Sequence, residues 1–335
     1  MQSYIFYRNF AEKNYLCAMQ LNAITRKSTL MATILLAVIV VAAVLRYWFA
    51  PFSVEVADSG AHESAWLVVI SVFLYMGNAL LQEKILSRSG LASNQCSLPI
   101  PIYGLLACGI FVAPDMAASS IASLCFAVAI YLLLRSLQSI EETDSVFFAS
   151  ILLGATALLY PPCIVLAAVI PIAVVTLALS LRQALLMIVG YMVPLFVTSY
   201  IVWYRGGGFF DVCNKLFSAL ALPQMSEVEG TPYLAISLAT FVGVLTLWGI
   251  IHSLVRPTKA LVLMRVRRAF YFFLLVTLSV STIILLPACD LAACAVIAVP
   301  MAIMLSFVLD VLPNVLSTIA YWTLLVLFFV HLFVA

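Results

Sequence analysis

Charged side chains are scarce in this sequence. They make up 9% of its 335 residues, whereas 65% of the residues are hydrophobic. Soluble domains carry about 25% charged and about 45–50% apolar residues. Because a water-soluble fold of this length has too little interior to bury so much apolar surface, we expect a membrane protein.

Motifs that would indicate a soluble enzyme are also lacking. The eight cysteines include no C-x-x-C pair, and most lie in apolar stretches, where cysteine behaves as a small hydrophobic residue. Zinc signatures, nucleophile elbows and dinucleotide fingerprints are missing, and the glycines at 206–208 lack the Lys-Ser/Thr of a phosphate loop. No metal site is predicted, and no cofactor is assigned. The net charge of +2 gives no support for a nucleic-acid partner.

Long apolar runs make up most of the chain, and a helix that spans a bilayer needs about 20 such residues. We predict an all-α transmembrane bundle of about eleven spans, or nine if one short hairpin is re-entrant. The predicted helices are Leu30–Phe49, Ala65–Leu81, Leu98–Ala113, Met116–Leu134, Ser145–Tyr160, Cys163–Ser180, Ala184–Trp203, Pro232–Leu254, Ala269–Pro287, Leu291–Leu309 and Val315–Val334. The third and fifth are short and lie next to prolines, so each is also a candidate for a partial helix buried by its neighbours.

The chain divides into two parts. Residues 1–29 form a polar N-terminal segment, and Met19 is an alternative start that would make residues 1–18 an artefact. Residues 30–335 form a single transmembrane domain, which includes a segment at 205–231 that we expect in the outer membrane interface.

Basic residues are unequally distributed between the two sides of the predicted bundle. Of the 16 Lys and Arg residues, only Arg46, Arg205 and Lys215 fall on one side. The opposite side carries Arg8, Lys13, Arg26, Lys27, Lys84, Arg88, Arg135, Arg182, Arg256, Lys259, Arg265, Arg267 and Arg268. Cytoplasmic loops are enriched in Lys and Arg. We therefore predict a bacterial inner-membrane protein with a cytoplasmic N-terminus and an outer C-terminus.

Ionisable side chains are lacking from the middle of every predicted span. Because such residues usually mark proton or ion pathways, their absence argues against an ion-coupled transporter. Asn78 is predicted near the inner end of the second span. Together with Gln138, it is a candidate to line the cavity of a lipid transporter.

The first outer loop gathers three carboxylates and an imidazole within nine residues: Glu55, Asp58, His62 and Glu63. Such groups suit a divalent cation or a general base that activates a hydroxyl group. A solvated acidic loop is the alternative. We take Glu55 and Asp58 as catalytic candidates, and His62 and Glu63 as substrate-binding candidates.

A second outer segment begins with Arg205 and three glycines, which allow the backbone to turn sharply. The stretch after them places Phe209, Phe210, Cys213, Leu216 and Phe217 mainly opposite Asp211, Asn214 and Lys215. This pattern is typical of a helix that lies in the membrane interface. Arg205 and Lys215 are candidates to bind a lipid phosphate or pyrophosphate; simple contact with lipid headgroups is the alternative.

Three apolar stretches, Leu152–Pro162, Val189–Pro194 and Ile297–Ala302, carry a first resemblance. On these residues the chain resembles an uncharacterised family of bacterial multi-pass inner-membrane proteins, which implies the architecture but no activity. In layout, the helix pair at a proline turn, the acidic first outer loop and the interfacial helix resemble GT-C glycosyltransferases that use polyprenyl-phosphate sugars. That resemblance implies that Glu55 or Asp58 acts at the acceptor or a metal. The chain differs in its short first outer loop, which has no acidic pair, and in having no soluble outer domain.

These features together predict a glycosyltransferase-like protein that handles polyprenyl-linked sugars at the outer face, in envelope glycan assembly. Its expected partners are the lipid bilayer and the polyprenyl-phosphate-linked sugar, and no protein partner is indicated. Two other classes remain open. One is a lipid transporter or flippase, and the other is a non-catalytic subunit that scaffolds an envelope complex.

Overall fold

All regular structure in the described part of the chain is helical. The computed structural model describes residues 29–49, 65–91, 97–107, 116–136, 143–220, 260–285, 293–312 and 314–334, together with positions 243, 247 and 251. No strand occurs within these ranges. The predicted all-α class is therefore confirmed.

The helices follow the apolar runs of the sequence closely. They are α2 (Thr29–Phe49), α3 (Ala65–Ser89), α4 (Pro99–Ala107), α5 (Met116–Ser136), α6 (Thr143–Leu159), η3 (Pro161–Ala168), α7 (Val169–Thr176), α8 (Leu181–Tyr204), α9 (Asp211–Ser218), α11 (Ala260–Ser281), η4 (Thr282–Leu285), α12 (Ala293–Val311) and α13 (Asn314–Val334). The predicted span Pro232–Leu254 lies outside the described residues, apart from three helical positions.

Four helices are long enough and apolar enough to cross a membrane. They are Val69–Ser89 in α3, Ala117–Ser136 in α5, Leu181–Tyr204 in α8 and Ala293–Asp310 in α12. At a rise of about 1.5 Å per residue, helices of this length match a hydrocarbon layer of about 30 Å. These four helices indicate a membrane protein. Four shorter apolar helices, within α2, α6, η3–α7 and α13, accompany them.

Four of the predicted spans differ clearly from the helices of the structure. The ninth begins at Ala260 and not at Ala269, so α11 includes Arg265, Arg267 and Arg268. The second span does not end at Leu81, because α3 continues through Glu83 and Lys84 to Ser89. The third span is represented among the described residues by the nine-residue α4 alone. The sixth begins at Pro161 as a 3₁₀ helix and becomes α-helical at Val169. Pro161 and Pro162 occupy the first two positions of this segment, where a backbone N–H has no intrahelical partner and proline is tolerated.

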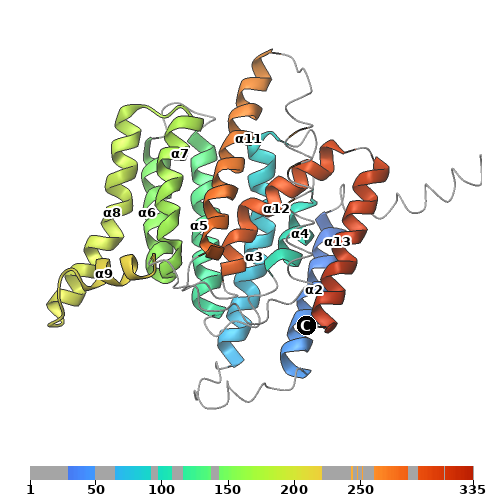
Figure 1. The fold of residues 1–335 in the computed structure, drawn as a ribbon, viewed down its shortest axis with the longest axis horizontal. Helices are drawn as coiled ribbons and strands as arrows, with labels where there is room; N and C mark the ends of the chain where they lie inside the picture. The colour runs from blue at the N-terminus through green and yellow to red at the C-terminus, as the bar shows by residue number, and fades with distance from the viewer. Residues whose placement is uncertain are drawn as a thin grey trace, which may run out of the picture.

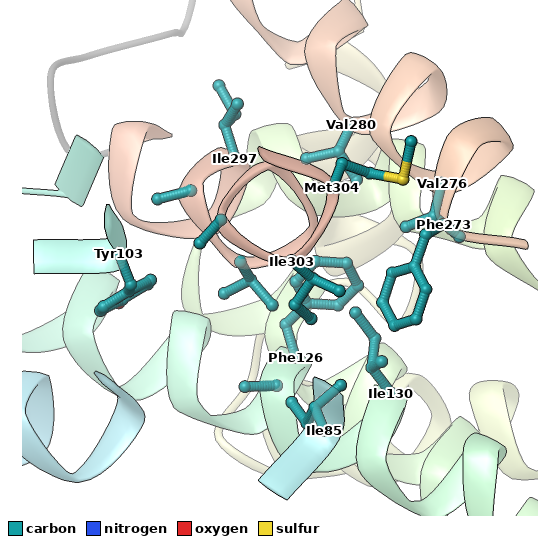
Figure 2. Close-up of a cluster of buried hydrophobic side chains, with 14 of the residues drawn as sticks. Ile85, Tyr103, Phe126, Ile130, Phe273, Val276, Val280, Ile297, Ile303 and Met304 are labelled. Atoms are coloured by element: carbon teal, nitrogen blue, oxygen red, sulfur yellow. The ribbon is translucent and has the colours of Figure 1, made fainter. Parts of the chain in front are cut away.

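The centre of the bundle is α12. Within its membrane-length window 78% of the residues are buried, compared with 22% for α8. Figure 2 shows side chains of α12, among them Ile303 and Met304, in contact with residues of the surrounding helices, including Phe126 of α5 and Phe273 of α11. In Figure 1, α8 lies at one side of the bundle, and α2 and α13 pack together at the other.

Helices α6 and α8 approach each other closely at two glycines. A Cβ atom added at Gly154 would lie 2.5 Å from the carbonyl oxygen of Tyr191, and one at Gly190 would lie 2.0 Å from Ser150 Oγ. Small residues allow membrane helices to pack with their backbones in contact. The peripheral helix α8 is therefore held to the bundle by backbone-level packing.

Candidate functional site

The end of α8 makes a sharp glycine turn into α9. The N–H of Arg205 donates to the carbonyl oxygen of Ile201 at 3.1 Å and closes the helix. Gly206 follows with φ of +91°, a conformation that side chains with a Cβ rarely adopt. The N–H of Gly208 then donates to Asp211 Oδ2 at 2.7 Å, which fixes the start of α9. The glycine run thus has the turning role that we predicted.

Helix α9 is amphipathic, as the sequence predicts, and it begins at Asp211. Leu216 packs into the protein, whereas Phe210 and Phe217 are 68% and 64% exposed. Phe209 is half-buried, with its ring centroid 6.3 Å from that of Phe196 on α8. Figure 1 shows α9 lying across the bundle at the end where α8 finishes. One apolar edge of α9 is therefore available to lipid.

The two predicted phosphate-binding cations are both exposed in this region. Arg205 caps the C-terminus of α8, and Lys215 lies on the polar side of α9, with Asp211 and Asn214. Arg205 is thus fixed by the glycine turn, and Lys215 is fixed by the helix that follows it. Both cations are therefore open to solvent at the junction of α8 and α9.

The other predicted site residues, Glu55, Asp58, His62 and Glu63, lie outside the described residues. Their placement relative to Arg205 and Lys215 stays a prediction. Among the residues that the structure describes, no three metal-binding side chains come together.

A second polar region, which the sequence reasoning mostly missed, lies inside the bundle. Asn78 Nδ2 donates to the hydroxyl oxygens of Tyr103, at 2.8 Å, and of Ser123, at 2.9 Å. Gln82 Nε2 donates to Asn78 Oδ1 at 3.2 Å. These four side chains come from α3, α4 and α5, and none is more than 1% exposed. We call them the Asn78 cluster.

Asn78 lies near the middle of Val69–Ser89, the part of α3 that is long enough and apolar enough to cross a membrane. Its predicted place near the inner end of the span stays a prediction. The sequence does contain a signal for a polar face around Asn78. It is the spacing of Ser71, Tyr75, Asn78 and Gln82. Steps of four, three and four residues place them on one face of a helix.

The short helix α4 is fixed by this polar face of α3. Eight of its nine residues are buried. The hydroxyl of Tyr75 donates to the carbonyl oxygen of Gly104, and the rings of Tyr75 and Tyr103 lie 5.5 Å apart. A Cβ added at Gly104 would lie 2.5 Å from Leu36 Cδ1 of α2, so the Leu36 side chain would have to shift to admit it. Tyr103 is thereby held in position against Asn78.

Comparison with known proteins gives one match. Residues 31–335 match a family whose description is "Family of unknown function (DUF6427)". No curated protein and no solved structure matches the chain.

Proposed function

Because the chain belongs to the DUF6427 family, whose function is unknown, we propose a function from its own residues. It is a multi-pass protein of a bacterial inner membrane that handles polyprenyl-phosphate-linked sugars at the outer face, in envelope glycan assembly. The observation that carries this proposal is the pair of exposed cations, Arg205 and Lys215, at the ends of a glycine turn and an amphipathic helix.

The proposed topology has about eleven spans, a cytoplasmic N-terminus and an outer C-terminus. Its support is the strong inequality of Lys and Arg between the two sides. The arrangement of the helices agrees with it. The C-terminal end of α3 lies beside the N-terminal part of α11, since a Cβ on Gly90 would be 3.8 Å from Val266. In Figure 1, α9 lies at the opposite end of the bundle from the start of α11.

Lipid-linked phosphate suits the junction of α8 and α9. Arg presents a planar fork of donors that matches phosphate oxygens, and Lys adds a second positive charge. The exposed rings of Phe210 and Phe217 give the same element an apolar edge for the polyprenyl chain. A substrate with an anionic head and a long apolar tail satisfies both features.

The proposed reaction is glycosyl transfer, with the resemblance to GT-C enzymes as its support. Glu55 or Asp58 accepts the proton of an acceptor hydroxyl, whose oxygen attacks the anomeric carbon of the sugar. The glycosidic bond forms as the bond between the anomeric carbon and the phosphate oxygen breaks. The lipid phosphate leaves with the bonding electrons, and Arg205 and Lys215 stabilise its negative charge. His62 and Glu63 would contact the sugar or the acceptor.

The test is the profile of polyprenyl-linked sugars in cells that lack the gene. We expect one intermediate to accumulate and to be cleared by the wild-type gene. The double variant Arg205→Gln, Lys215→Gln and the variant Asp58→Asn are expected not to clear it. The matched control is Arg182→Gln, which removes an exposed arginine from the first turn of α8, at the other end of the bundle.

Each result of this test has a defined meaning. If Asp58→Asn clears the accumulated intermediate and the double variant does not, the protein still acts on lipid-linked sugars. The role of Asp58 as the base would then be wrong. An unchanged profile in cells lacking the gene would overturn the glycan proposal. The remaining interpretation would then be a non-catalytic subunit that scaffolds an envelope complex.

A further inference from the structure

A buried polar face runs along α3 through the interior of the bundle. Ser71, Tyr75, Asn78 and Gln82 all point into the protein, with exposures of 0–1%. The ends of this face, Ser71 and Gln82, lie about 16 Å apart along the helix axis. Hydrocarbon offers polar groups no hydrogen bonds, so a continuous polar face inside membrane-length helices needs a specific reason.

The hydrogen bonds along this face are complete at its centre and incomplete at its ends. Asn78 uses its amide to join Tyr103 and Ser123, as described above. In contrast, Ser71 Oγ and Gln82 Oε1 are buried without a hydrogen-bond partner among the described residues. Buried polar atoms are nearly always paired in native proteins, and each exception requires an explanation. A group that binds at either end of the face and supplies hydrogen bonds is such an explanation.

The chemistry of the polar face selects a neutral ligand. Amides and hydroxyls both donate and accept hydrogen bonds, and none of the residues on the face carries a charge. The nearest carboxylate along α3, Glu83, is half-buried and accepts a hydrogen bond from Ser97, outside the Asn78 cluster. A divalent cation or an anion would have no opposite charge here. A neutral group rich in hydroxyls can donate to Gln82 Oε1 at one end of the face or accept from Ser71 at the other.

Helix α4 contributes one side of such a site. Its nine described residues extend about 13 Å, and eight of them are buried by the neighbouring helices. From α4, Tyr103 contributes its hydroxyl to the Asn78 cluster. Helix α12 packs against another side of α4.

We propose that α3, α4 and α5 enclose a binding site for a neutral, polyhydroxylated group, closed in this structure. Asn78, Tyr103 and Ser123 form its centre, and Ser71 and Gln82 form its ends. The ligand is a sugar, either free or as the headgroup of a lipid. The proposal rests on the buried polar face of α3 and does not depend on the junction of α8 and α9.

The test measures access to the site with iodoacetamide, a small neutral polar reagent, on the purified full-length protein in nanodiscs. Peptide mass spectrometry follows alkylation of the variant Gln82→Cys. The matched control is Ile85→Cys, which is also fully buried on α3 but lies one turn beyond the polar side chains, near the apolar Phe126 and Ile130 (Figure 2). We expect the cysteine at 82 to react about tenfold faster than the one at 85, because local opening admits polar molecules along the polar face.

Protection then identifies the ligand class. A site for free sugars is supported if D-glucose slows alkylation at position 82 and an equal concentration of KCl does not. Protection only by octyl glucoside below its micelle concentration supports the headgroup of a glycolipid. Equal reactivity at 82 and 85, or no protection by either sugar, overturns the proposal. If Gln82→Cys does not fold, Ser71→Cys at the other end carries the same expectations.

Discussion

Glycines 154 and 190 show how a single missing side chain determines a helix contact. At Gly154 the nearest atoms to an added Cβ are the Tyr191 carbonyl oxygen, at 2.5 Å, and Pro194 Cγ, at 2.6 Å. The first is a backbone atom and the second belongs to a rigid ring, so neither can move aside as a flexible side chain would. The contact between α6 and α8 therefore depends on glycine at this position.

We predict that Gly154→Ala destabilises the protein by about 1–3 kcal/mol, the usual cost of overpacking. The measurement is thermal unfolding of the purified protein in detergent. Gly77→Ala is the matched control, because a Cβ at Gly77 of α3 meets nothing within 4 Å. The control is expected to be neutral or to stabilise by up to about 1 kcal/mol. Equal melting temperatures for both variants would contradict the close contact between α6 and α8.

At the scale of the element, α9 combines a buried edge, a polar side and an exposed apolar edge in eight residues. Leu216 anchors it to the protein, and the half-buried Phe209 holds the chain before it against α8. The exposed Phe217 and the charged Lys215 then point to opposite sides of the helix. An interfacial helix requires this division, because one side contacts acyl chains while the other contacts water.

We predict that a photoreactive benzoylphenylalanine at position 217 crosslinks to lipid acyl chains in native membranes. The same group at Lys215 is expected not to crosslink, because position 215 lies on the opposite, polar side of α9, which faces water. Mass spectrometry of the irradiated protein measures the lipid adducts. Lipid adducts at 215 that match those at 217, or none at either position, would contradict an interfacial α9.

The sequence predicts helices well and their internal polar contacts poorly, for a physical reason. Apolar runs are local properties, so the predicted Met116–Leu134 and Val315–Val334 closely match α5 and α13. The rule that ends a span at its first charge placed the end of α3 at Leu81, although a helix can continue through charged residues beyond the hydrocarbon. Asn78 bonds to partners 25 and 45 residues away. Such pairings depend on how helices pack, which the spacing of residues on one helix does not reveal.

At the scale of the whole molecule, the candidate site at the junction of α8 and α9 could be predicted only in part. The glycine turn and the amphipathic helix are local features, and both are confirmed. The relation of Arg205 and Lys215 to the acidic loop at 51–64 depends on the fold at that end of the bundle, and it stays a prediction. The topology of the entire chain determines whether these groups face the same compartment.

We predict that alkaline phosphatase, which is active only outside the cytoplasm, is active when fused after Ser218. A fluorescent protein that matures only in the cytoplasm is expected to fluoresce when fused after Ser136. The reason is the concentration of Lys and Arg at the end of the bundle where α5 finishes. Both nine and eleven spans give this result. Phosphatase activity after Ser136 would reverse the proposed orientation.

The central position of α12 imposes an order on biosynthesis. Residues 293–311 occupy the middle of the bundle, yet they leave the ribosome after nearly all the helices that they contact. Until α12 is inserted, α4 lacks one of the helices that cover it. The Asn78 cluster then lies next to the space that α12 will occupy. Nascent membrane chains with uncovered polar groups are prone to misassembly. Maturation of this protein therefore depends on holding the early helices together in the membrane until a late one is inserted among them.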